Sequence, residues 1–180
     1  MLTLKDLHTN VPVVSALIER EHLGEKQLLI QTRWKPDRDP VHSGTLEIPA
    51  GWMSLYEDVY DALRREVREE TGLKVLRIFP DIRTKTCSVN RDPNFAFVPF
   101  CCQQQLGGDG AFPWVGYVFL CKVENKDPIS QKSETANPHW ENTSELRSII
   151  KETPERIFTL QRGTLDFYLN HDWKSMYGEF

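Results

Sequence analysis

Apolar positions along the chain gather into short runs that are separated by polar turns. Aliphatic and β-branched residues dominate residues 11–20, and a second run covers residues 27–34. Further runs occupy residues 46–50, 74–82, 95–102 and 114–123, and the last of these is the clearest. Runs of this length, bounded by glycine, proline and charged residues, are typical of β-strands.

One segment departs from this pattern. Val59, Leu63 and Val67 recur at four-residue spacing, which predicts a helix over residues 57–71 with one apolar face. Gly72 follows as a helix stop, because glycine readily adopts the left-handed conformation that ends many helices. The helix is thus the first expected after a series of strands.

The C-terminal part of the chain is predicted to be helical. A helix is expected from Thr143 or Ser144, which suit an N-cap, to about residue 151. A second helix is expected after Thr153, because Pro154 suits the first helical position. Polar or glycine-rich segments separate the apolar runs and are predicted to be loops: 35–43, 103–113 and 124–138.

The order of these elements predicts an α+β fold. Strands arrive in runs rather than in strict alternation with helices, which favours a mixed sheet packed between helices. A length of 180 residues fits one domain, so we expect residues 1–180 to form a single unit with the helices from about residue 143 packed on it.

Composition narrows the class of protein. Apolar residues make up 39% of the chain and charged residues 27%, which is typical of a globular domain. The net charge of −4 argues against a nucleic-acid-binding surface. The four cysteines show no C-x-x-C pair, so reduced thiols are expected rather than zinc. With no signal-like or membrane-spanning apolar run, a cytoplasmic location without membrane contact is expected.

Three glutamates lie in an unusual place on the predicted helix. At 3.6 residues per turn, Glu66, Glu69 and Glu70 fall within about 100° of arc, and this arc overlaps the apolar face. A solvated, ion-paired helix is the simpler explanation for most acidic runs. Charged groups at an apolar face are costly, however, and clustered carboxylates are the ligands that Mg²⁺ prefers. The pattern therefore favours a metal site.

The residues from 51 to 73, GWMSLYEDVYDALRREVREETGL, resemble the signature of the Nudix hydrolases with every fixed position filled. The resemblance implies an α/β/α sandwich over roughly residues 11–151. It also implies hydrolysis of a nucleoside diphosphate linked to another group, with Mg²⁺ or with Mn²⁺ in its place. The strand–loop–helix context expected around residue 51 is the one that this signature requires.

The resemblance also assigns roles to individual residues. It implies that Glu66, Glu69 and Glu70 hold the metal together with the backbone carbonyl of Ala50. Glu66 or Glu69 would act as the general base, and these two alternatives stay open. Two further signature residues, Arg65 and Glu57, would pair with each other and orient the carboxylates.

Members of the family often add a carboxylate from a late loop, shortly before a tryptophan. Trp140 begins such a segment here, so Glu134 is the expected catalytic carboxylate and Glu141 is its competitor. Lys35 and Arg38 suit phosphate contacts, although a solvated loop is the simpler role for them. Aromatic residues that would suit stacking on a base are Trp34, Phe95, Phe112 and Trp140.

The substrate class rests on the run from Glu47 to Gly51, which resembles the E-x-P-A-G segment of ADP-ribose and nucleotide-sugar pyrophosphatases. The proline that ADP-ribose hydrolases carry past the signature is missing. We expect a small nucleoside diphosphate derivative as substrate, and a homodimer is left open. The alternatives are a mutator-type nucleoside triphosphate pyrophosphohydrolase and a non-catalytic nucleotide-binding regulator, which would be expected to lose signature carboxylates that this chain retains.

Overall fold

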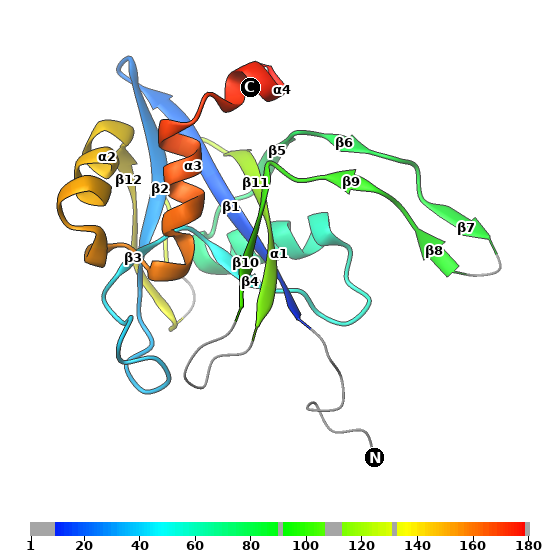
Figure 1. Ribbon diagram of the computed structural model, residues 1–180, viewed down its shortest axis with the longest axis horizontal. Coiled ribbons are helices and arrows are strands. Elements are labelled where there is room, and N and C mark those ends of the chain that lie inside the picture. Colours follow the sequence, from blue (N-terminus) through cyan, green and yellow to red (C-terminus); the bar gives the residue numbers. More distant parts are fainter. Residues whose placement is uncertain (1–9, 90–91, 107–112, 131–132, 179–180) are drawn as a thin grey trace.

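The long strand β1 (Val11–His22) is the centre of a computed structural model that describes residues 10–89, 92–106, 113–130 and 133–178. Its first part pairs in parallel with β11 (Trp114–Val123), and its end pairs antiparallel with β2 (Glu25–Arg33). The main path through the sheet is β10-β11-β1-β2-β12 (Figure 1). The remaining strands of the sheet and its edges are β3 (Leu46–Glu47), β4 (Ala50–Trp52), β5 (Val75–Phe79), β10 (Cys101–Gln105) and β12 (Thr135–Asn142).

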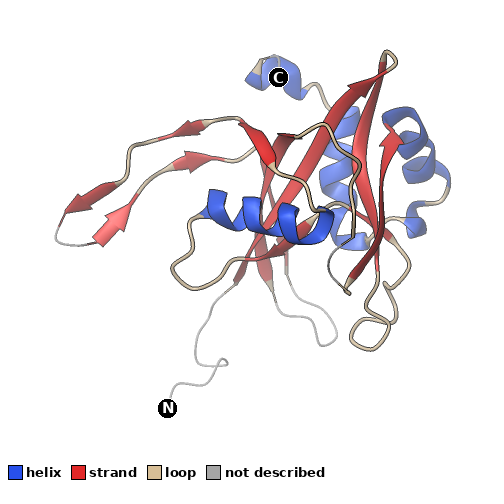
Figure 2. Cartoon of the chain, turned by 180° about the vertical axis from the view of Figure 1, so that it is seen from behind, coloured by secondary structure: helices blue, strands red, loops and turns tan. Residues whose placement is uncertain are grey.

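Helices cover the sheet on both faces, which confirms the predicted α+β sandwich. Helix α1 (Val59–Thr71) lies on one side, and α2 (Thr143–Glu152), α3 (Arg162–Asn170) and α4 (Trp173–Tyr177) lie on the other (Figures 1 and 2). Alternation along β1 divides the core between them. Val14, Ala16 and Ile18 pack in a cluster with α1, while Leu17 packs in a second cluster with α2 and α3. No helix in the described part of the chain is long and apolar enough to cross a membrane.

Helix α1 forms where the four-residue spacing predicts it, beginning two residues later than expected. Asp58 is its N-cap and accepts a hydrogen bond from the backbone N–H of Tyr60 at 2.7 Å. Gly72 ends it in the left-handed conformation with φ of 72°, as the sequence indicated. The helix buries Val59, Leu63 and Val67 against the sheet, so its register relative to the sheet is fixed by packing.

An arm of two short ribbons extends away from the body of the molecule (Figures 1 and 2). Its strands are β6 (Ile82–Arg83) paired with β9 (Phe97–Val98), and β7 (Cys87–Val89) paired with β8 (Asp92–Asn94). The strands predicted over residues 74–82 and 95–102 are each divided in two, with β5 and β10 in the main sheet and β6 and β9 in the arm. Phe100 is fully buried, but Ile82 is 56% exposed. At the base of the arm, Phe97 of β9 packs against Tyr60 of α1.

The C-terminal predictions need three corrections. Strand β12 begins at Thr135, inside the segment predicted to be a loop, and α2 is capped by Asn142 rather than by Thr143 or Ser144. The helix expected after Thr153 is replaced by two 3₁₀ turns, η1 (Pro154–Arg156) and η2 (Thr159–Gln161), before α3 begins. The reason is a tertiary contact: the Phe158 backbone N–H donates to the Leu46 carbonyl at 2.8 Å, so this backbone pairs with β3 instead of with itself.

Two further segments, both near the cavity described below, differ from their predicted secondary structure. The single strand expected over residues 46–50 is two strands, β3 and β4, with Ile48 and Pro49 between them. Gln161 bridges this gap, because its side chain accepts from the Ile48 N–H at 2.6 Å and donates to the Ile48 carbonyl at 3.0 Å. Strand β10 extends into the loop predicted over residues 103–113, and residues 107–112 lie outside the described part of the chain.

Candidate active site

A cavity of about 460 Å³ lies where β1, β4, α1 and the 3₁₀ segment meet. Three kinds of surface line it. Glu66 and Glu70 of α1 and the backbone of β4 form an acidic side, and residues after β2 form a basic side. The third side is largely apolar and contains Val13, Trp114 and Leu160.

Glu66 and Glu70 are the deepest carboxylates of α1. Each has a relative exposure of only 5%. Glu70 is held by two donors, because its Oε2 accepts from Gln31 Nε2 at 2.8 Å and from the Ala50 backbone N–H at 3.1 Å. The helix face that carries them also carries the apolar core residues, so burial of the core brings these two carboxylates to the cavity.

Gly51 is required by the close approach of β4 to α1. A Cβ atom built at residue 51 would overlap the Glu66 carboxylate. The absence of a side chain therefore lets Glu66 lie directly against the backbone of the strand that precedes the helix. Ala50, whose carbonyl the resemblance implies as a metal ligand, lines the same part of the cavity.

Arg65 connects the helix, the loop before it and β4. Its Nε and Nη2 donate to the two carboxylate oxygens of Glu57 at 2.7 and 2.8 Å, and its Nη1 donates to Glu66 at 2.6 Å. Nη2 also donates to the Trp52 carbonyl at 3.0 Å. The hydrogen bonds from Arg65 lower the pKa of Glu57 to about 2, and those to Glu57 raise the pKa of Arg65 above its ordinary value. This residue therefore fixes the orientation of Glu66.

Glu69 occupies a different place from Glu66 and Glu70. Its side chain is 42% exposed, its carboxylate lies 3.5 Å from Arg65 Nη1, and it is not among the described residues that line the cavity. In the part of the chain that the structure describes, no three His, Cys, Asp or Glu side chains converge closely enough to hold a metal on their own. A metal here would need backbone or substrate oxygens in addition to Glu66 and Glu70.

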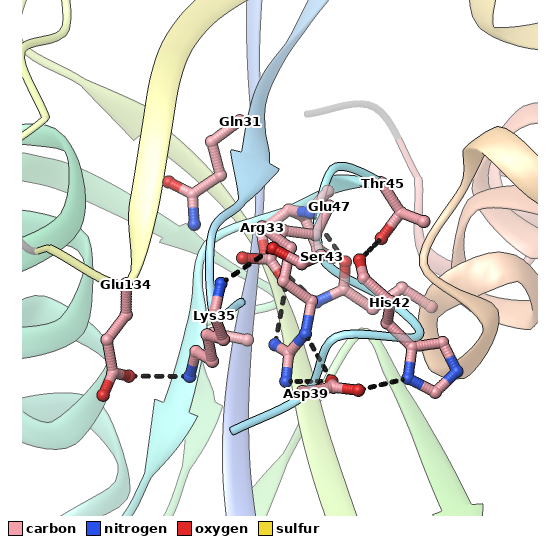
Figure 3. A network of polar contacts seen from close by, with 12 residues as sticks. Gln31, Arg33, Lys35, Asp39, His42, Ser43, Thr45, Glu47 and Glu134 are labelled. Atoms are coloured by element: carbon pink, nitrogen blue, oxygen red, sulfur yellow. Dashed lines mark hydrogen bonds and ion pairs between the residues drawn. The ribbon is translucent and has the colours of Figure 1, made fainter. Parts of the chain in front are cut away.

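A second network organises the opposite side of the cavity (Figure 3). Arg33 lies between two carboxylates, 2.8 Å from Asp39 and 3.1 Å from Glu47. Burial raises the pKa of Glu47, and this effect is larger than the lowering caused by the positive charge of Arg33. Burial acts in the same sense on Asp39, but hydrogen bonds from His42 and Arg33 outweigh it and hold the pKa of Asp39 below its ordinary value. The segment after β2 is thus largely exposed, as expected, while Asp39 and Ser43 anchor its inner side to Arg33 and to the Lys35 backbone.

Glu134 lies at the cavity beside two cations, and its contact with Lys35 is drawn in Figure 3. Its carboxylate is 2.7 Å from Lys35 Nζ and 2.8 Å from Arg38 Nη1, and all three residues line the cavity. Its competitor Glu141 does not line it; the Glu141 carboxylate lies 3.6 Å from His139 and accepts from the Asn142 N–H. The structure brings Glu134 to the same cavity as Glu66 and Glu70, and leaves Glu141 outside.

The aromatic residues at the cavity are not those expected. Trp34 and Phe95 do not line it, Trp140 packs against the core beneath Arg20, and Phe112 lies outside the described residues. Among the residues that the structure describes, the aromatic lining residues are Trp52, Trp114 and Phe158 instead. Sequence reasoning also missed five polar lining residues or supports, which are Ser15, Gln31, Arg33, Gln103 and Gln161. Ser15 alone carried a signal, as the single polar residue within the apolar run from residue 11 to 18.

Comparison with known proteins gives a family and a fold. The model of the NUDIX domain matches residues 9–161. A comparison with curated proteins gives no match. Solved structures that are similar include the NUDIX domain of Shewanella oneidensis NrtR complexed with ADP ribose, with a TM-score of 0.60, 13% identity and coverage of 82% of each chain.

The structures of two hydrolases are similar to this chain to a comparable degree. A NUDIX hydrolase from Nitrosomonas europaea has a TM-score of 0.59 and 18% identity, with 87% of this chain and 86% of that chain covered. The C. elegans Ap4A hydrolase in a binary complex has a TM-score of 0.54 and 18% identity, with 89% and 99% covered. At these identities the structures support the fold, and the family model carries the assignment. The chain belongs to the NUDIX domain family and is a pyrophosphohydrolase of the Nudix type.

Proposed function

We propose that the protein uses Mg²⁺ or Mn²⁺ to hydrolyse the pyrophosphate bond of a nucleoside diphosphate linked to another group. The observation that carries this proposal is the pairing of Glu66 and Glu70, both buried, against the backbone of Ala50 and Gly51 in one cavity. Lys35 and Arg38 face the same space and suit the phosphate oxygens.

The balance of charge in the cavity supports a divalent cation. Among the described lining residues, four carboxylates (Glu47, Glu66, Glu70 and Glu134) stand against three cations (Arg33, Lys35 and Arg38). A pyrophosphate would add more negative charge to a site that is already acidic. Bound Mg²⁺ or Mn²⁺ supplies the neutralisation that attack on a pyrophosphate requires.

The donor set fits such an ion. Glu66 and Glu70 offer carboxylate oxygens at the cavity and Ala50 offers its carbonyl, all hard oxygen ligands of the kind that Mg²⁺ and Mn²⁺ take. Glu69 would join them only by turning from Arg65 toward the cavity. Substrate phosphates would complete the set, which agrees with the lack of a closed cage among the described side chains. Gly51 lets the Glu66 carboxylate lie against β4, next to the Ala50 carbonyl, as this arrangement requires.

The other polar residues have supporting roles in the proposal. Arg65 and Glu57 hold the Glu66 carboxylate in a fixed orientation, and Gln31 does the same for Glu70. Glu66 or Glu69 removes the proton from the attacking water. Glu134 assists from the opposite side of the cavity, where phosphate oxygens would compete with it for Lys35 and Arg38.

A panel of substrates with identified products tests the proposal. Purified protein in Mg²⁺ buffer is incubated with ADP-ribose, nucleotide sugars, dinucleoside polyphosphates and nucleoside triphosphates, and the products are separated by chromatography. The expected result is a nucleoside monophosphate and a phosphorylated second group from a diphosphate derivative. A triphosphate as best substrate, with release of inorganic pyrophosphate, would overturn the substrate class.

A further inference from the structure

Two polar atoms at the cavity have no hydrogen-bond partner among the residues that the structure describes. They are Ser15 Oγ on β1 and Gln103 Nε2 on β10, and both atoms are buried. Ser15 has a relative exposure of only 1%. Unpaired buried polar atoms destabilise a folded protein, so those that persist call for an explanation. A ligand that enters the cavity would supply the missing partner for both.

The position of Gln103 depends on a missing side chain. Val13, Gly116 and Gln103 lie in register across β1, β11 and β10. A Cβ at Gly116 would lie 2.9 Å from Gln103 Cγ and 2.7 Å from Trp114 Cζ3. Glycine at residue 116 therefore lets both side chains lie over the middle strand, where they line the cavity.

A hydrogen bond from helix α3 fixes the side-chain amide of Gln103. Thr164 on α3 donates from Oγ1 to Gln103 Oε1 at 2.5 Å. This bond occupies the oxygen of the amide and leaves its nitrogen as the unpaired donor. The donor is thus held in place before any ligand arrives, which lowers the entropic cost of binding.

The surroundings of the two atoms indicate the chemistry of their ligand. Val13 and Trp114 lie around Gly116 beside Gln103, and with Leu160 they give the cavity apolar surface that includes one large ring system. Ser15 is two residues further along β1, opposite Ala50 of β4. Lys35 and Arg38 lie among the lining residues of the basic side and suit phosphates. A flat group with hydrogen-bond acceptors on its edge matches the apolar side, and a nucleobase has both properties.

We propose that Trp114, Gln103 and Ser15 form the subsite that binds the nucleobase of the substrate. The base lies against Trp114, and Gln103 Nε2 donates to an acceptor atom on its edge, with the Ser15 hydroxyl as second partner. This inference rests on the proposed function and extends it, because it assigns the specificity for the nucleoside part to residues far from the Nudix signature in the sequence.

Binding of reaction products tests the subsite without any catalytic step. Isothermal titration in Mg²⁺ buffer measures the affinity for AMP, GMP, UMP and CMP, and for ribose 5-phosphate, which lacks the base. The wild-type protein is expected to bind at least one nucleotide ~10-fold or more tightly than ribose 5-phosphate. Gln103→Met and Ser15→Ala are each expected to weaken that nucleotide by about 5–10-fold and to leave ribose 5-phosphate unchanged.

Gln104→Met is the matched control, because Gln104 is the next residue of β10, is exposed and does not line this cavity. It should leave all affinities unchanged. Melting temperatures separate binding from folding: Ser15→Ala removes an unpaired hydroxyl and should not lower the melting temperature. Wild-type affinities that are equal for nucleotides and ribose 5-phosphate would overturn the subsite, as would equal losses for both ligands in Gln103→Met.

The substrate panel distinguishes this failure from failure of the proposed function. Metal-dependent hydrolysis combined with unchanged nucleotide binding in Gln103→Met leaves the proposed function standing and contradicts the subsite. Base-dependent binding that is lost in Gln103→Met, without hydrolysis of any substrate, supports the subsite and contradicts the proposed function.

Discussion

The α1 side of the cavity and its sheet side, formed by β1, β10 and β11, hold their polar groups in different ways. On the α1 side, Arg65 contacts Glu57 and Glu66, while Glu70 accepts from Gln31 and from the Ala50 backbone. On the sheet side, Ser15 Oγ and Gln103 Nε2 line the cavity and lack partners within the described residues. Gln31 Oε1 lacks one as well, but Gln31 does not line the cavity and its amide nitrogen donates to Glu70. One side is organised by its own contacts, and the other presents groups that a ligand can engage.

This difference fits a division between chemistry and recognition. Groups that act on a transition state work best when their orientation is fixed before the substrate arrives. Groups that select a substrate gain specificity when the wrong ligand leaves them unpaired. The predictions below test the organised side first, because changes there are expected to have the larger effects.

The largest effect is expected from Glu70→Gln. The substitution keeps the size of the side chain but removes the charge proposed to hold the metal, so kcat should fall by at least ~10²-fold. Asp61→Asn is the control, because Asp61 is an exposed carboxylate on the same helix, paired only loosely with Arg64 at 3.7 Å. If Glu70→Gln turned over substrate at close to the wild-type rate, Glu70 would not be a metal ligand.

Gly51→Ala should be the next most severe. The added Cβ would overlap the Glu66 carboxylate and displace it from β4, so kcat should fall by roughly 10- to 100-fold. Gly163→Ala provides the comparison, because a Cβ there meets nothing within 4 Å and residue 163 is helical. That control should keep full activity and gain up to ~1 kcal/mol of stability. An active Gly51→Ala enzyme would show that Glu66 need not lie against β4.

A smaller effect is expected at the basic side of the cavity. Glu134→Gln should lower kcat by about 10-fold with little change in melting temperature, since Glu134 lines the cavity and is partly exposed. Glu141→Gln, outside the cavity, should be mild. Steady-state kinetics of both variants with the best substrate provide the measurement. The reverse ranking would assign the late carboxylate to Glu141.

The smallest effect concerns stability at low pH. The pKa of Glu57 is lowered from 4.5 to about 2, so its contribution is fully present above about pH 4.5 and is lost as the pH falls toward 2. The difference in melting temperature between wild type and Glu57→Gln should therefore be constant from pH 7 to 5 and shrink below pH 4.5. A difference that stays constant down to pH 3 would show that the Arg65 pair does not stabilise the fold.

The sequence predicts the α1 side of the cavity because its residues are encoded locally. Glu57, Arg65, Glu66 and Glu70 lie within one turn and helix, where spacing alone determines which side chains share a face. Asp58 and Gly72 mark the helix ends with ordinary capping chemistry. Helical periodicity therefore locates the helix and its acidic face, although Glu69 of that face lies outside the cavity. The pairing of Glu57 with Arg65 was implied by the resemblance to the Nudix signature rather than by spacing.

The sheet side was not predicted because it is assembled from distant strands. Gln103 reaches the cavity across Gly116 and is fixed by Thr164, and this arrangement depends on strand register that no local pattern reveals. The same cause explains the missed strand β12 and the 3₁₀ segment, whose backbones pair with β2 and β3. In both regions tertiary pairing overrides local propensity.

The dependence of hydrolysis on divalent cation tests the central claim most directly. The rate of pyrophosphate cleavage is measured with the best substrate of the panel over a range of free Mg²⁺ concentrations, and again after chelation and after addition of Mn²⁺. We predict no turnover in chelator, a saturable rise with Mg²⁺ and recovery with Mn²⁺. Cleavage that continues at full rate in chelator would contradict a metal-dependent reaction in the cavity of Glu66 and Glu70.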